Sequence, residues 1–151
     1  MSLVRLIYAS KIKDGHGPND IMKIVEVSEK NNQRKGITGA LCFGPRHFLQ
    51  CLEGNRDEIN RLYNKIVTDG RHTDVALLYY SDICERVFGD WAMGYVLAEK
   101  SLHDIVFRFS GSRTFNPYDF TGTQAVRFLQ AVVKERQEAL ASEADQTHIQ
   151  S

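Results

Sequence analysis

Residues 48–54, F-L-Q-C-L-E-G, predict a β-strand that is covered on both sides. Alternate side chains of a strand point to opposite faces, so Phe48, Gln50 and Leu52 share one face and the residues between them share the other. Both faces are apolar except for the Gln50 amide. A buried amide without hydrogen-bond partners costs about 1–3 kcal/mol. A partner for Gln50 is therefore expected on the side of Phe48 and Leu52.

The segments around this strand predict an α+β domain. Five strands are expected, at residues 4–10, 36–43, 48–52, 75–80 and 91–97. Two helices alternate with them, one opening at Pro18 and one at Asn55, which gives the order βαββαββ. Right-handed crossovers put both helices on one face of a five-stranded mixed sheet, in a ferredoxin-like plan. Residues 102–109 and the run from Thr121 predict C-terminal helices that cover the other face. In the last strand, the side chains expected to share one face are Trp91, Met93, Tyr95 and Leu97.

The composition is that of one globular domain. The chain has 151 residues, of which 42% are hydrophobic and 25% charged, enough for one core. Its 19 basic residues balance 19 acidic residues, which argues against binding to nucleic acid or to an anionic membrane. Cys42, Cys51 and Cys84 are widely spaced and predict neither a disulfide framework nor a metal site. Without a signal segment or a run of about 18 apolar residues, the protein is expected to be soluble and cytoplasmic.

Several polar residues are expected to meet in a slot between the two helices. Tyr8 in the first strand points to the same face as Gln50, and Asn31 and Asn32 end the apolar stripe of the first helix. The walls of this slot are expected to be Ile24, Phe48, Leu52 and Ile66. A flat heteroaromatic ring with several carbonyls and ring nitrogens would satisfy the polar groups.

Simpler explanations exist for most of these residues. Tyrosine is common in strands because of its β-propensity, and Asn31 and Asn32 could cap the end of a helix. Gln50 is different because glutamine is a poor packing residue in a strand. The stretch 69–72, D-G-R-H, could bind phosphate through Arg71, or could complement the helix dipole and then meet solvent.

Together these residues form a pattern that resembles the BLUF family, the blue-light sensors that use FAD. The motifs are R-L-I-Y-A-S at 5–10, N-N-x-x-x-G-I-T-G at 31–39, F-L-Q-x-L-E-G at 48–54, D-x-R-H at 69–72 and W-A-M at 91–93. The resemblance runs from Leu3 to about Leu97. The region 106–128, with R-F-S-G near Arg108, further resembles the short PixD type, which carries no fused output domain.

The resemblance implies a role for each residue of the slot. Tyr8 and Gln50 would form the photoactive pair, with Gln50 bonded to flavin N5/O4 and to Tyr8. The pyrimidine edge of the flavin would meet Ser28, Asn31 and Asn32. The ring faces would meet Ile24, Phe48, Leu52 and Ile66. The ribityl and phosphate end would meet Lys65, Asp69, Arg71 and His72. FAD is the implied cofactor, and FMN or riboflavin could enter the same pocket. Lys65 stands where arginine is common, which keeps the charge but loses the bidentate fork.

The resemblance also implies a photoreceptor and not an enzyme. Tyr8 would give an electron to the excited flavin, a proton would pass through Gln50, and the amide would end in a changed hydrogen-bond arrangement with a small red shift. Trp91 and Met93 would transmit the signal. Residues 1–97 would form the flavin-binding domain, and 98–141 a helical extension for oligomer and partner contacts. Residues 142–151 have little to bury and are expected, from the sequence itself, to form a disordered tail. The implied partners are further copies, as a dimer or a decameric ring, and a response-regulator-like output protein.

Two other functions remain compatible with the residue pattern. An acylphosphatase-like hydrolase would share the ferredoxin-like plan and bind phosphate through Arg71 and His72, although no phosphate-cradling loop is evident. A small flavin oxidoreductase would use the same pocket, although the chain has no G-x-G-x-x-G fingerprint for a nicotinamide cofactor. A colourless protein would favour the first, and rapid turnover of reduced nicotinamide would favour the second.

Overall fold

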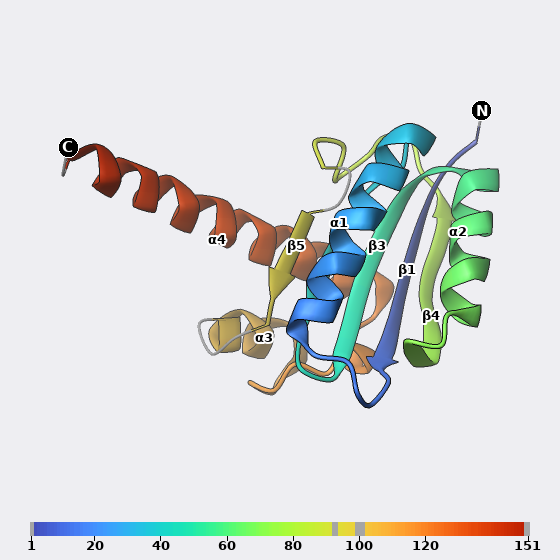
Figure 1. Ribbon diagram of the computed structural model, residues 1–151, viewed down its shortest axis with the longest axis horizontal. Coiled ribbons are helices and arrows are strands. Elements are labelled where there is room, and N and C mark those ends of the chain that lie inside the picture. Colours follow the sequence, from blue (N-terminus) through green and yellow to red (C-terminus); the bar gives the residue numbers. More distant parts are fainter. Residues whose placement is uncertain (1, 92–93, 99–101, 150–151) are drawn as a thin grey trace.

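A computed structural model describes residues 2–91, 94–98 and 102–149 (Figure 1). Along the chain the elements are β1 (Leu3–Ile12), α1 (Pro18–Lys35), β2 (Thr38–Phe43), β3 (His47–Asn55), α2 (Arg56–Thr68), β4 (His72–Asp82), β5 (Gly94–Leu97), α3 (His103–Ser110), the 3₁₀ helix η2 (Pro117–Asp119) and α4 (Gly122–Ile149). The strands form one sheet in the order β4-β1-β3-β2-β5, antiparallel except for the parallel pair β2–β5. The predicted βαββαββ order and five-stranded mixed sheet are confirmed.

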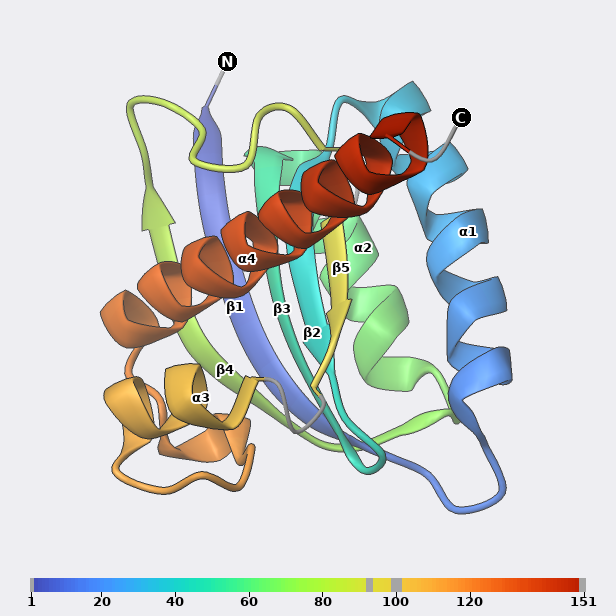
Figure 2. The same cartoon turned by 90° about the vertical axis from the view of Figure 1, so that its left-hand side faces the viewer.

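Helices cover the sheet on both faces, with α1 and α2 on one side and α3 and α4 on the other (Figures 1 and 2). Each face has its own apolar core. The core under α1 and α2 contains Tyr8, Phe48 and Leu52, and the core under α3 and α4 contains Ile7, Leu49 and Cys51. The alternation predicted for residues 48–52 is therefore present, and it places Gln50 on the side of α1 and α2. None of the described helices combines the length and apolar character needed to span a bilayer.

The end of α1 differs from a cap made by asparagines. The helix continues past Asn31 and Asn32 to Lys35, and Gly36 ends it in the left-handed region with φ 67°. The Gly36 N–H donates to the carbonyls of Asn32 and Gln33, which satisfies the last turn. Both asparagines therefore lie within the helix and not at its cap.

The last strand is shorter than predicted. β5 begins at Gly94, and Trp91 lies before it in irregular chain. The Trp91 ring packs 6.1 Å from the Phe88 ring, in the core under α3 and α4, whereas Tyr95 packs on the core under α1 and α2. The prediction that Trp91 and Tyr95 share a face is wrong, because side-chain alternation holds only inside a strand. Met93 lies outside the described residues.

The disordered tail predicted from residue 142 is instead the last part of α4, which continues to Ile149 and projects beyond the sheet (Figure 1). Residues 137–145 are exposed, so burial does not explain this helix. Its glutamates, alanines, glutamine and leucine have high intrinsic helix propensity, and they continue a helix that packing has already started at Phe128 and Val132.

Candidate functional site

A cleft of about 540 Å³ opens between α1 and α2, above β1 and β3. The predicted site residues that line it are Tyr8, Ile24, Ser28, Asn31, Asn32, Phe48, Gln50, Lys65, Ile66, Asp69, Arg71 and His72. Leu52 is the exception. Its side chain is buried in the core next to the cleft and does not line it. The volume lies within the roughly 300–1,000 Å³ typical of pockets for small molecules and cofactors.

The cleft is also lined by residues that the sequence did not single out as site residues: His16, Asp20, Lys23, Val25, Val27, Leu41 and Leu62. Two patterns could have revealed most of them. Asp20, Lys23 and Val27 recur at helical spacing with Asn31, so they share a face of α1. Leu41 is the β2 neighbour of Gln50 in the sheet register. Residue spacing and strand pairing thus extend the site beyond its predicted members.

Tyr8 and Gln50 are direct cross-strand neighbours on β1 and β3. The Tyr8 hydroxyl donates a hydrogen bond to Gln50 Oε1 at 2.5 Å, and both side chains are buried. Burial, with smaller contributions from Tyr63 and Asp69, raises the pKa of Tyr8 above its ordinary value, so the phenol keeps its proton and acts as the donor. The partner expected for the buried Gln50 amide is therefore Tyr8, at the floor of the cleft.

His72 forms a second wall beside this pair. Its Nδ1 lies 2.9 Å from Ser10 Oγ, and its ring is 4.7 Å from the Phe48 ring and edge-on to Tyr8 at 6.4 Å. Burial lowers the pKa of His72, with a partly opposing contribution from Asp69. A neutral imidazole therefore lies between Phe48 and the phenol, where the sequence alone suggested only a phosphate ligand or a solvent-exposed basic residue.

Charged residues gather at the rim of the cleft. Arg71 donates to the Asp69 carboxylate at 2.6–3.0 Å, and this pairing holds the pKa of Asp69 below its usual value. Lys23 and Lys65 lie on the same rim, from α1 and α2. Asp69 partly neutralises Arg71, and Asp20 lines the cleft as well, so Lys23 and Lys65 leave the lining with only a small excess of positive charge.

The two asparagines occupy different positions on α1. Asn32 is buried, whereas Asn31 is half-buried and accepts a hydrogen bond from the Arg34 guanidinium. Both line the cleft above Gln50. Amide groups supply donors and acceptors together, so this wall can match a ring edge that presents both carbonyl oxygens and a ring N–H.

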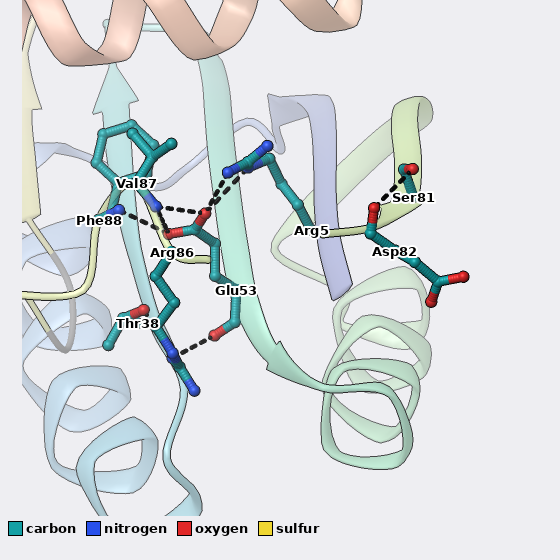
Figure 3. A network of polar contacts seen from close by, with 8 residues as sticks. All are labelled: Arg5, Thr38, Glu53, Ser81, Asp82, Arg86, Val87 and Phe88. Carbon is teal, nitrogen blue, oxygen red and sulfur yellow. Dashed lines mark hydrogen bonds and ion pairs between the residues drawn. The ribbon is translucent and has the colours of Figure 1, made fainter. Parts of the chain in front are cut away.

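A buried carboxylate joins β3 to the segment that leads to Trp91 (Figure 3). Glu53 is fully buried and accepts hydrogen bonds from the Arg5 guanidinium and from the backbone N–H groups of Val87 and Phe88. The Arg86 guanidinium, from the same segment as Val87 and Phe88, donates to the backbone carbonyl of Glu53 and to Thr38 Oγ1 on β2. The sequence did not reveal this role, because a strand glutamate followed by glycine gives no sign of its distant partners.

Comparison with known proteins identifies the family to which this cleft belongs. A family model described as BLUF, sensors of blue-light using FAD, matches residues 3–94. The chain belongs to this family. The BLUF chain is 32% identical over 102 residues to the blue light- and temperature-regulated antirepressor BluF of Escherichia coli (strain K12), which covers 68% of this chain and 25% of that protein.

Two solved structures are similar to this BLUF protein. The photo-activated state of BlsA superposes with a TM-score of 0.78 at 31% identity, covering 87% of this chain and 94% of that chain. A bacterial light-regulated adenylyl cyclase superposes with a TM-score of 0.64 at 39% identity, covering 68% of this chain and 32% of that chain. The chain thus spans about a quarter of the antirepressor and a third of the cyclase.

These findings confirm the predicted family, fold and blue-light sensing function. A BLUF domain is a flavin-binding photosensor and not a catalytic domain. Among the described residues there is no cluster of three or more histidine, cysteine or acidic side chains that could hold a metal ion.

Proposed function

We propose that this protein binds FAD in the cleft between α1 and α2 and signals blue light through a change in the hydrogen bonds of Gln50. The observation that carries the proposal is the buried Tyr8–Gln50 hydrogen bond on the cleft floor. A phenol and a carboxamide in contact can exchange donor and acceptor roles, because the amide offers both kinds of group. The cleft therefore has a switchable contact where a ring would lie.

The donor set fits a flavin. Ile24, Ile66 and Phe48 supply apolar walls for the ring, and Ser28, Asn31 and Asn32 supply polar groups for its pyrimidine edge. Gln50, whose oxygen faces Tyr8, would direct its amide N–H groups to N5 and O4. Leu52 would support the ring from the buried layer beneath the lining residues. When bound, the flavin supplies blue-light absorption and an excited-state electron acceptor.

The protein's own residues then carry the proton and electron. Tyr8 gives up an electron, and its hydroxyl proton passes to Gln50 Oε1, the atom to which it is already hydrogen-bonded. On charge return Tyr8 would regain its electron, and the Gln50 amide would give back one proton: either the one it received, which leaves the amide rotated, or one from its nitrogen, which leaves the other tautomer. No net redox change remains, so the expected product is a small red shift of the flavin absorption and not bleaching.

The rim charges support FAD as the cofactor, with FMN and riboflavin as weaker ligands. Lys65, and with it Lys23, would attract the phosphates, and Arg71 and His72 would lie near the ribityl chain. Asp69 would hold Arg71 in place. An acylphosphatase-like hydrolase is less well supported, because the Arg71 guanidinium that it would use for phosphate is already paired with this carboxylate.

The signal would leave through the segment that follows β4, which is hydrogen-bonded to Glu53 at Val87 and Phe88 and leads to β5. Trp91 packs outside the cleft against Phe88, and its carbonyl accepts from Gly39 N–H on β2, so a shift of the central strands reaches this segment directly. Met93 would belong to the same segment. Residues 98–141 would present the surface for further copies, as a dimer or ring, and for a response-regulator-like output protein. The proposed compartment is the cytoplasm.

Absorption spectroscopy of the FAD-loaded protein and its variants tests the proposal. Tyr8→Phe and Gln50→Ala should bind flavin but lose the reversible light-induced shift, whereas Tyr80→Phe, at an exposed position of β4, should keep it. A normal shift in Tyr8→Phe or Gln50→Ala would overturn the mechanism. Rapid oxidation of reduced nicotinamide by the loaded protein would instead favour the oxidoreductase.

A further inference from the structure

Tyr118 joins the C-terminal extension to three strand ends on the side of the sheet opposite the cleft. Its hydroxyl donates to the backbone carbonyl of Asp74 on β4 at 2.7 Å. Its ring lies 5.9 Å from the His47 ring on β3 and 6.0 Å from the Lys11 ammonium on β1. One side chain of η2 therefore contacts β1, β3 and β4 together.

The same strand ends carry a wall of the cleft. Lys11 pairs with His47 in the β1–β3 register, and the next pair is Ser10 with Phe48. Adjacent pairs point to opposite faces, so Ser10 and Phe48 lie on the cleft side, where both contact His72. Tyr118 and His72 thus hold neighbouring residue pairs from opposite sides of one sheet.

The β4 backbone between His72 and Asp74 is unusual. Asp74 has φ 52° and is the one residue other than glycine with positive φ in the part of the chain that the structure describes. The β1–β4 register shifts at this point, between Ala9 and Lys11. Aspartate tolerates the left-handed region better than most residues, but such a conformation persists only where the surroundings hold it. The Tyr118 hydrogen bond and the Lys11–Asp74 ion pair at 3.5 Å are those surroundings.

We propose that Tyr118 is a positioning residue for the flavin cleft: it fixes the bulge at Asp74, and through it the His72–Phe48 wall beside Tyr8 and Gln50. The inference rests on the proposed function and adds to it a contact between the cleft and the C-terminal extension that bypasses β5. Loss of the contact loosens this wall, so that Gln50 returns more easily to its dark arrangement. A change of partner or oligomer contact at η2 would then alter the lifetime of the light state.

Two variants and one control test the proposal in the chain of 151 residues. Tyr118→Phe removes the donor and keeps the ring, Tyr118→Leu removes both, and Tyr80→Phe removes a hydroxyl near the other end of β4. The first readout is amide hydrogen exchange of residues 69–78 in the flavin-free protein. We expect about two- to tenfold faster exchange in Tyr118→Phe, the range for one hydrogen bond, and no change in the control.

The second readout is dark recovery of the FAD-loaded protein after blue light. Tyr118→Phe should recover about two- to tenfold faster with an unchanged size of red shift, and Tyr118→Leu faster still. A residue that only anchors η2 would change thermal stability without changing the recovery rate. Unchanged exchange at 69–78, or recovery equal to that of Tyr80→Phe, would overturn the inference while leaving the photoreceptor function intact.

Failure of the proposed function would look different. A wild-type protein without a red shift would contradict that function, and the exchange measurement would still decide whether Tyr118 holds the bulge. Should Tyr118→Leu not fold, Tyr118→Phe alone decides both readouts.

Discussion

Replacing the buried Glu53 by alanine should lower the free energy of unfolding far more than replacing a partly exposed glutamate. The Glu53 side chain is fully buried, and its carboxylate accepts from Arg5 at 2.8 and 3.0 Å and from the Phe88 N–H at 2.7 Å. Glu53→Ala leaves the Arg5 side chain, which is only 12% exposed, without its anion. Breaking a buried pair in this way costs about 3–5 kcal/mol of unfolding free energy. For a chain of about this size that equals a fall in Tm of roughly 6–20 °C.

The assay is urea unfolding of the flavin-free protein, followed by circular dichroism and by tryptophan emission. Trp91 is the only tryptophan of the chain, and it lies three residues after Phe88, so its emission reports on the segment that Glu53 holds. Glu58→Ala is the matched control, because Glu58 pairs with an exposed Arg61 one turn away on α2 and should cost at most about 0.5 kcal/mol. The reasoning is refuted if Glu53→Ala lowers the free energy of unfolding by no more than about 1 kcal/mol beyond the loss in Glu58→Ala.

Three further predictions follow from single contacts. Burial lowers the pKa of His72, so the neutral ring contributes its full stability above pH 6.5 and loses it as the pH falls toward the folded-state pKa. In His72→Gln the fall in Tm below pH 6.5 should therefore be smaller than in the wild type. An unchanged profile of Tm against pH would contradict this role of His72. Gly36→Ala should cost about 1–2 kcal/mol in urea unfolding because φ is 67°. Gly89→Ala should cost less, because φ is not positive there and an added Cβ would make only ordinary van der Waals contact with Arg86; equal losses would refute the capping role. Lys65→Ala should weaken FAD binding about two- to fivefold more than riboflavin binding, and the difference should shrink at high salt. Titration followed by flavin fluorescence checks this, with Lys30→Ala as the control. Equal weakening of both ligands would exclude a phosphate contact of Lys65.

The fold and most of the cleft could be predicted because they follow from local patterns. Alternating side chains on β1 and β3 put Tyr8 and Gln50 on one face, and the βαβ crossovers put both helices above that face. These constraints hold whatever the details of packing. The predicted walls and polar residues accordingly line the cleft, with Leu52 one layer below them.

Other features depend on contacts between distant residues, which spacing does not encode. Trp91 leaves the β5 pattern because the preceding segment is tied to Glu53 and Thr38. The contact between Tyr118 and Asp74 joins residues separated by 44 positions. The length of α4 was missed for a different reason: burial was expected to end the helix, whereas helix propensity continues it.

The most direct test of the central claim is the absorption spectrum of the purified, FAD-loaded protein in the dark and after blue light. A switch at Tyr8 and Gln50 predicts that the whole flavin band moves slightly to longer wavelength, without bleaching, and returns in the dark. Flavin that stays bound but shows only permanent bleaching, or no change at all, would contradict it.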